Sequence, residues 1–289
     1  MVPSRLLIAL LLAPIAAPAV AQDDPPARSD TASLPADAAN RDSLTLGAGI
    51  GIVPSYEGSD DYVIIPAAVV RGQIDGFNFS SRGLQLTLDL VRGPKPQGLD
   101  IQFGPAIALN LNRTNRLVDR QVRLLGKRSV AFEAGGYAGI SKTGVITSAY
   151  DTLGARVTVL ADTTGVHRSY TITPSVEYGT PLSRKAYVGL SLSGTWVGDG
   201  YARTYFGVDA AGAARSGLPA FANPRGGFKN WTVGALGNYA VTGDLLHGLS
   251  LFATGSYSRL QGDFARSPIV SVAGSPNQFF GAVGLAYTF

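Results

Sequence analysis

The sequence predicts an all-β protein, a closed antiparallel transmembrane β-barrel of about 12 strands. Three observations predict this fold: side chains alternate with a period of two, glycine and aromatic residues are abundant, and residues 22–289 contain no long uninterrupted apolar run. Gly accounts for 36 of 289 residues, Tyr and Phe for 12 each, and charged residues for only 15%. A membrane barrel needs close strand crossings, aromatic girdles and an apolar outer face, and this composition supplies all three.

The first 21 residues have the features of a secretory signal peptide. Arg5 is the only charged residue among them, the stretch 6–20 is almost wholly apolar, and Ala19-Val20-Ala21 fits the small-x-small cleavage rule. Residues 22–43 follow with five Asp against two Arg and three Pro, a composition that cannot bury a core. We therefore expect a cleaved signal peptide (1–21), a flexible acidic lead-in (22–43) and a barrel (44–289).

Alternation divides the barrel region into strands, although residues 144–162 also fit two short strands, so the predicted count ranges from ten to fourteen. Leu86 and Leu88 are predicted to face the lipid and Thr87 the interior. The predicted strands are 44–52, 61–72, 77–79, 84–90, 99–111, 130–140, 144–162, 166–179, 185–198, 228–242, 248–260 and 277–289.

Bacterial barrels have an even strand count, periplasmic termini, short periplasmic turns and longer outer loops. This rule places the long connections 53–61, 113–128, 199–227 and 261–276 outside the cell. It leaves the turns 73–76, 92–98, 141–143, 163–166, 180–184 and 243–247 in the periplasm.

The closing segment alternates bulky and small side chains up to Phe289. Its pattern resembles the last strand of bacterial outer-membrane barrels, in which the terminal aromatic residue is part of an assembly signal. We therefore predict that Phe289 and Tyr287 serve as that signal.

A cationic loop follows the fifth predicted strand. Its positive charges recur every three or four residues, which would align them on one face if the segment were helical. The loop is either a solvated segment or an outer-rim patch that binds lipopolysaccharide phosphates. The residues of the predicted patch are Arg113, Arg116, Arg120, Arg123, Lys127 and Arg128.

Four acidic residues alternate with apolar neighbours and are predicted to point into the barrel: Asp89, Asp100, Glu133 and Glu177. Arg71, Arg156 and Arg168 are their expected partners. Such charges form either a structural network that fills the lumen or the lining of a narrow aqueous pore.

Little in the sequence points to catalysis. Only His167 and His247 are present, both in turns predicted to be periplasmic and far from the outer loops, and Cys is absent. The pair Asp60-Asp61 is expected to bond to its own turn. No catalytic, cofactor or metal site is predicted.

Several segments together resemble one family of outer-membrane proteins, the MltA-interacting protein (MipA)/OmpV family. The resemblance rests on residues 49–59, 201–208, 216–221, 257–263 and 267–270, with Gln278 before the closing strand. It implies a non-enzymatic barrel in the Gram-negative outer membrane, a scaffold that joins a lytic transglycosylase to a penicillin-binding peptidoglycan synthase. A small-solute channel or a surface adhesin are the alternatives, with lipid and lipopolysaccharide as neighbours and no nucleic acid.

Overall fold

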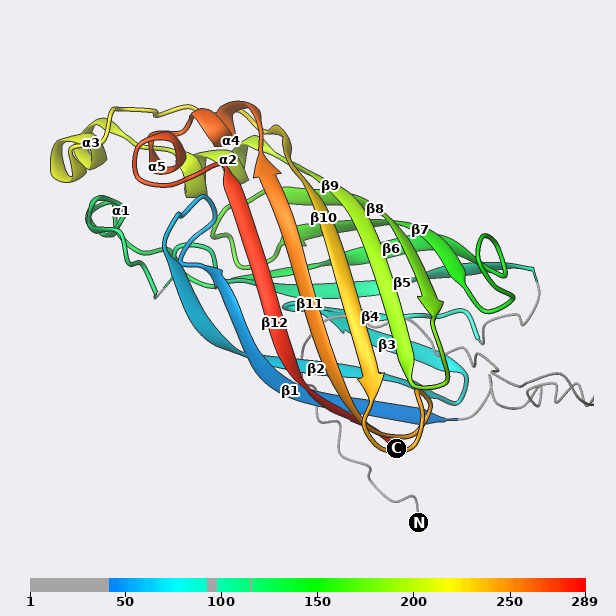
Figure 1. Cartoon of the computed structure of the whole chain (residues 1–289). Coiled ribbons are helices and arrows are strands. Elements are labelled where there is room, and N and C mark those ends of the chain that lie inside the picture. The colour runs from blue at the N-terminus through cyan, green and yellow to red at the C-terminus, as the bar shows by residue number, and fades with distance from the viewer. Residues whose placement is uncertain (1–41, 93–97, 115) are drawn as a thin grey trace, which may run out of the picture.

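The computed structural model describes residues 42–92, 98–114 and 116–289, and these form a closed barrel of 12 antiparallel strands (Figure 1). Each strand pairs with its neighbours in the chain, and β1 (Ser43–Pro54) closes the barrel by pairing with β12 (Asn277–Thr288). This confirms the predicted all-β barrel and its strand number. The predicted signal peptide and almost all of the lead-in lie outside the described residues.

The other strands differ in length, since two of them are much shorter than the rest. They are β2 (Tyr62–Ile74), β3 (Phe77–Arg82), β4 (Gln85–Leu88), β5 (Leu99–Asn110), β6 (Ala131–Thr143), β7 (Thr152–Asp162), β8 (Tyr170–Pro181), β9 (Ala186–Val197), β10 (Gly227–Ala240) and β11 (Gly248–Leu260). The helices are α1 (Arg120–Leu124), α2 (Asp199–Phe206), α3 (Ala210–Ser216), α4 (Gly262–Arg266) and α5 (Pro268–Ser271).

Alternation along each strand separates an apolar outer face from a more polar interior. Leu88 on β4 is 39% exposed on the outside, whereas its neighbour Thr87 is only 3% exposed and faces inward. Ile101 and Phe103 on β5 are likewise exposed on the outer face. The predicted register is therefore correct for both strands.

The β1–β12 junction depends on two facing glycines. Gly49 lies opposite Gly284 in the ladder, and a Cβ atom built on Gly49 would lie 2.1 Å from the carbonyl oxygen of Val283. Backbones that approach this closely leave no room for a side chain. Glycine at both positions thus lets the last strand close against the first.

The barrel has two different ends. The terminal end carries Ser43, the chain's last residue and short turns, while the capped end carries all five helices (Figure 1). Residues 163–169 lie at the capped end, so the prediction that 163–166 lies at the same end as the chain termini is wrong. The turn between β6 and β7 is formed by residues 144–151 rather than by the predicted 141–143, because the Asp151 carboxylate accepts backbone N–H groups of Val145 and Ile146 at 2.6 and 2.8 Å. β7 therefore crosses the wall once, as a single strand.

Among the described helices, none is both long and apolar enough to cross a bilayer.

Candidate functional site

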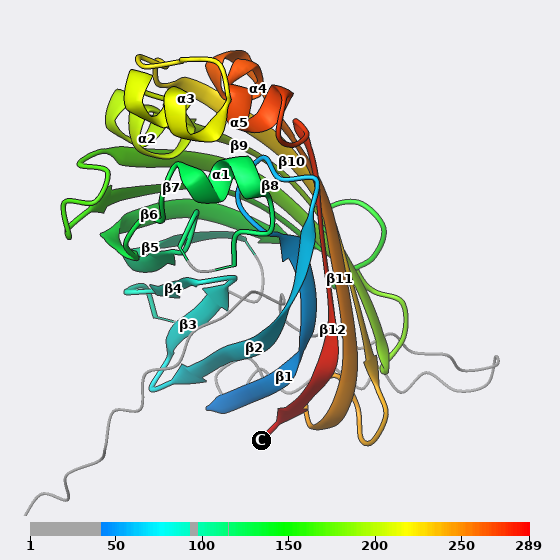
Figure 2. The same cartoon turned by 90° about the vertical axis from the view of Figure 1, so that its left-hand side faces the viewer.

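The helices and loops of the capped end lie side by side (Figure 2) and form a cap with its own apolar core. One cluster joins Tyr56 and Leu117 to Val208, Leu218 and Ile269, residues that come from four separate loops. A second cluster packs α2 against α4 and α5 and is made of Val197, Tyr201, Ala202, Tyr205, Phe206, Leu260, Phe264 and Val270. The cap is therefore a packed unit rather than a set of independent loops.

Polar contacts tie the same segments together. The Tyr56 hydroxyl donates to the carbonyl oxygen of Ile269 at 3.2 Å and also to that of Ala273. The Gln278 side chain accepts from Gly58 N at 2.9 Å and donates to Ser59 O at 3.0 Å. Most of the segments that carry the family resemblance thus meet in the cap, although they are far apart in the sequence.

A buried ion pair lies beneath the cap. Lys229 Nζ on β10 donates to the Glu57 carboxylate, which also accepts from the Tyr201 hydroxyl at 2.8 Å and from Asn112 Nδ2 at 3.2 Å. Lys229 also lies 4.9 Å from the centre of the Tyr201 ring. Because the carboxylate has three donors, the pair stays satisfied although Lys229 is buried.

His167 extends this network. Its Nε2 lies 3.1 Å from Glu133 Oε1, which also accepts from Asn110 Nδ2 at 3.0 Å, and its ring lies 5.2 Å from that of Tyr201. The prediction that His167 lies at the same end as the chain termini is therefore wrong, because that prediction depended on the misplaced turn at 163–166. His247 does lie at the terminal end, beside Tyr287.

Burial in the cap shifts several proton equilibria. Burial raises the pKa of the Tyr201 hydroxyl well above its usual value, and the nearby Glu57 charge adds to the shift. Burial, reinforced by Glu133, also raises the pKa of Tyr205. For Arg113, burial and the like charge of Arg128 lower the pKa to about 9. The cap interior thus disfavours new charge.

In the lumen, one ion pair spans the barrel. Arg82 at the tip of β3 pairs with Glu177 on β8, with Nη2 at 2.7 Å from Oε2. These strands lie almost opposite each other in the sheet order. Glu177 does face inward as predicted, but its partner is none of the three arginines expected for it.

Two other inward carboxylates, Asp89 and Asp100, bond to neutral donors. Asp100 accepts from Gln102 Nε2 at 2.9 Å, and Asp89 accepts from the backbone N–H groups of Val91 at 3.0 Å and Phe103 at 3.3 Å. Arg156 lies over the Tyr137 ring at 4.9 Å. Arg168 does not enter the lumen: it is an exposed residue of the loop 163–169, so its predicted inward position is wrong.

The cationic loop does not present one continuous positive face. Only Arg120–Leu124 is helical, because Asp119 caps this helix and Leu117, Val122 and Leu125 turn into the cap core. The loop leaves Arg116, Arg120, Arg123 and Lys127 exposed.

Arg113 is a correction to the predicted lipopolysaccharide patch, since its side chain is 0% exposed. Its guanidinium donates to Tyr205 O at 3.1 Å and Gly126 O at 3.3 Å. Arg128 is half-buried and donates to Thr204 O. The structure thus uses these two cations to hold backbone carbonyls inside the cap.

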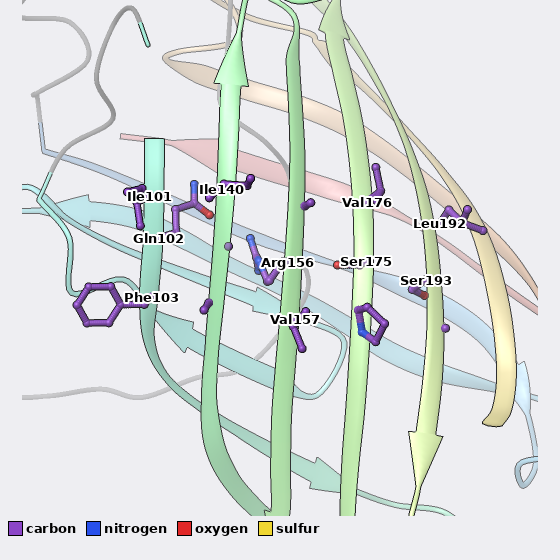
Figure 3. A pocket seen from close by; sticks show the side chains of 15 residues that line it. Ile101, Gln102, Phe103, Ile140, Arg156, Val157, Ser175, Val176, Leu192 and Ser193 are labelled. Atoms are coloured by element: carbon purple, nitrogen blue, oxygen red, sulfur yellow. The ribbon is translucent and has the colours of Figure 1, made fainter. Parts of the chain in front are cut away.

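The outer wall has a shallow apolar hollow of about 820 Å³ across β5 to β9 (Figure 3). Ile101, Phe103, Ile140, Val176 and Leu192 surround it, and all five are exposed on the outer face. Small side chains between them make the depression. Its chemistry suits contact with acyl chains.

At the terminal end, the rings of Tyr287 and Phe289 pack at a tilt of 59° with their centres 4.7 Å apart, and both are exposed. Phe289 N donates to Leu44 O at 2.9 Å, so the final residue is held against the first strand. Their role as an assembly signal stays a prediction.

Sequence reasoning missed Arg82, Tyr201 and Lys229 as network residues. Arg82 continues the inward alternation of Asn78 and Ser80, so extending the predicted strand 77–79 would have found it. Lys229 gives a weaker signal: it is one of only five lysines, at the start of a strand.

The described residues contain no group of three acidic or histidine side chains that could hold a metal ion. The fold and its interior define a class of protein: a closed 12-stranded barrel with an apolar outer face, a charged lumen and a packed cap. Within that class, the chain belongs to the MltA-interacting protein MipA family, whose model matches residues 46–289.

Solved structures resemble the chain at low identity. One is an outer membrane channel from Pseudomonas putida F1, with TM-score 0.42 and 14% identity over 93% of this chain and 100% of that one. The CymD monoaromatic hydrocarbon channel has a TM-score of 0.38 and 9% identity, over 86% of this chain and 89% of that one. OmpT of Vibrio cholerae has a TM-score of 0.36 and 9% identity, over 86% of this chain and 97% of that one. A search of curated proteins gave no match.

Proposed function

We propose that this protein is a non-enzymatic outer-membrane barrel that serves as an envelope scaffold. In this proposal a signal peptide directs export, the terminal end faces the periplasm, and that end binds a lytic transglycosylase and a penicillin-binding synthase. The family supports it, since its name describes a protein that interacts with MltA. The outward belt of Leu46, Ile101, Leu190 and Leu285 supports the membrane location.

Closure of the barrel interior is the observation that favours the scaffold hypothesis over the channel hypothesis. The Arg82–Glu177 pair crosses the lumen, and the packed cap covers one end above a second ion pair between Lys229 and Glu57. A wide pore would leave that path clear. A closed barrel suits a protein that positions partners better than one that conducts solutes.

The test is affinity purification of the tagged barrel from detergent-solubilised envelopes, beside planar-bilayer recordings on the same preparation. We expect a transglycosylase to co-purify and no discrete conductance steps. A matched control exchanges the terminal-end turn 241–247 for a turn of equal length from another barrel, which should reduce co-purification without affecting folding. Conductance without partner recovery would reject the scaffold.

A small-solute channel is the second candidate, because buried polar atoms in the lumen lack hydrogen-bond partners. They include Arg82 Nε, Arg156 Nη1 and Asn238 Oδ1. Water or a polar solute would satisfy such atoms. In this case conductance should appear and should rise when Glu177 and Arg82 are both replaced by smaller neutral residues.

The exposed cations at the rim belong to the same proposal. We expect Arg116, Arg120, Arg123 and Lys127 to contact lipopolysaccharide phosphates, since all four are exposed at the end that faces outward. Lipopolysaccharide retention by the purified barrel at low salt tests this. A triple change of Arg120, Arg123 and Lys127 to Gln should lower retention while leaving the melting temperature unchanged.

A further inference from the structure

The wall between β2 and β5 differs from the rest of the barrel because the two strands between them are short. β3 has six residues and β4 four, against 13 in β2 and 12 in β5. β2 pairs with β3 only over Arg71–Ile74. Among the described strands, residues 62–70 therefore have no ladder partner on this side; Figure 2 shows β1 and β2 continuing well beyond the β3–β4 hairpin.

The backbone on this edge of β2 has fewer unpaired N–H groups than an ordinary strand without a ladder partner. Val70 N and O both bond to the Ser81 hydroxyl, at 3.1 and 2.8 Å, so by alternation Ala68, Pro66 and Ile64 direct their backbone groups to the same side. Pro66 has no N–H to leave unpaired there. Proline also prevents an added strand from completing its ladder, so the edge disfavours peptide partners.

Side chains close the wall where the ladder is missing. From the facing loop, Arg116 Nη1 donates to Ile64 O at 2.8 Å. Nearer the cap, Asn112 and Glu57 exchange hydrogen bonds, with Glu57 N to Asn112 Oδ1 at 3.0 Å. We call this region the seam: β2 residues 62–70 and the hairpin tip and loop residues 111–114 and 116–119 that face it.

Both sides of the seam are apolar. Ile64 is 69% exposed on the outer face. On the inner face Val69 packs with Phe252 and Ala286 in an apolar cluster. A molecule that crossed here would therefore meet apolar surface before and after the seam.

We propose that the seam is a side entrance through which small apolar or weakly amphiphilic molecules move between the membrane and the barrel interior, with Arg116 as its latch. The inference rests on the proposed membrane location. Opening breaks few main-chain bonds, because side-chain bonds between Ser81 and Val70 and from Arg116 to Ile64 replace the ladder. Elsewhere the same opening would separate paired strands.

The absence of native cysteine permits a direct test. A Val69→Cys variant places a thiol just inside the seam, and an Ala282→Cys variant places one at a similarly buried inward site on fully paired β12. Both are reconstituted in vesicles and labelled with a lipophilic maleimide that partitions into the bilayer. We expect faster labelling at position 69.

Replacing the latch sharpens the test. Arg116→Gln should raise lipophilic labelling at position 69 about fivefold, the order expected for loss of one solvent-exposed hydrogen bond. It should not affect position 282 or labelling by a charged, water-soluble maleimide. Arg168→Gln, which removes an exposed charge from another loop at the same end, is the matched control and should leave every rate unchanged.

Two results overturn the side entrance: equal lipophilic labelling at positions 69 and 282, or the same effect from Arg116→Gln and Arg168→Gln. A parallel rise with the water-soluble reagent also counts against it, since that indicates general loosening. Insertion is checked by heat-modifiable migration on gels. Failure to insert rejects the membrane location itself, whereas normal insertion with equal rates rejects only the entrance.

Discussion

The wall from β9 to β12 and the wall from β2 to β5 are built from similar alternating sequences but are closed in different ways. β11 and β12 are paired residue by residue from Gly248 to Arg259. β4 and β5 share only three paired positions, and β3 and β4 four. One side of the barrel is thus closed by main chain, and the other partly by side chains of Ser81 and Arg116.

This difference bears on where the barrel can open. Within a bilayer no water replaces a lost backbone hydrogen bond, so a continuous ladder is costly to separate. A side chain that bonds to a single carbonyl constrains the wall less and can be removed without disturbing the strand. Changes in the continuous wall should therefore threaten the whole fold, whereas changes at the seam should act locally.

The largest effect is expected at the glycine junction of the continuous wall. Gly49→Val would force a side chain against the backbone of β12, where even Cβ meets Val283 O and Gly284 Cα. We expect a loss of about 3 kcal/mol or more in unfolding free energy, or failure to close. Urea unfolding in detergent measures it.

Gly237→Ala on β10 is the matched control, because no atom lies within 4 Å of its added Cβ. It should change stability by less than about 1 kcal/mol. Comparable losses for both variants would mean that close approach of the strands is not what the junction requires.

The next effect concerns the outer face of the continuous wall. Leu192→Arg places a charge in the lipid-facing belt and should cost about 2–4 kcal/mol near the bilayer midplane. Ser193→Arg points the same side chain into the lumen, beside Ser175, and should cost less. Unfolding in lipid vesicles compares the two, and a reversed order would mean that β9 is shifted by one residue.

A smaller effect is expected for the pair that holds the β3–β4 hairpin. Glu177→Gln leaves the Arg82 guanidinium without its counter-charge, and both side chains are partly exposed, at 32% and 22%. We expect a loss of about 1–2 kcal/mol. Adding Arg82→Met should recover part of this loss, because it removes the unpaired charge; strict additivity would indicate that the pair does not couple.

The continuous wall could largely be predicted from alternation, and the seam could not. The period of two located β11 and β12 within a residue or two, because each strand is long and half-buried. The short hairpin was predicted as 77–79 and 84–90, since four to six residues give alternation little length to act on. Arg82 was missed for the same reason, and its partner lies 95 residues away.

The cap shows a second limit of sequence reasoning. Charge spacing placed Arg113 on a surface helix, whereas the apolar side chains of Leu117, Val122 and Leu125 decide how the loop packs and draw Arg113 inside. The predicted long connections 53–61, 113–128, 199–227 and 261–276 all lie at the capped end, but the sequence did not predict that they pack against one another. Such contacts join separate loops, and no local pattern encodes them.

The smallest expected effect concerns the cap, whose stability should depend on alkaline pH in a way that the two walls do not share. Burial raises the pKa values of Tyr56, Tyr201 and Tyr205 above the ordinary 10.0, so above about pH 10 the folded cap holds protons that the unfolded chain releases. Stability should therefore fall as pH rises beyond 10.

Arg113 acts in the opposite sense in the same titration. Its pKa is lowered to about 9 from 12.5, so between these values the unfolded chain binds more protons and the contribution of Arg113 rises with pH. Three tyrosines outweigh one arginine, and we expect a net loss that becomes steeper in an Arg113→Met variant. Tyrosinate absorbance, followed with the unfolding midpoint from pH 8 to 12, measures both. If all tyrosines ionised near pH 10 while the unfolding midpoint stayed constant, the cap would be open to solvent. The cap would then not be the packed unit that distinguishes it from the wall with the seam.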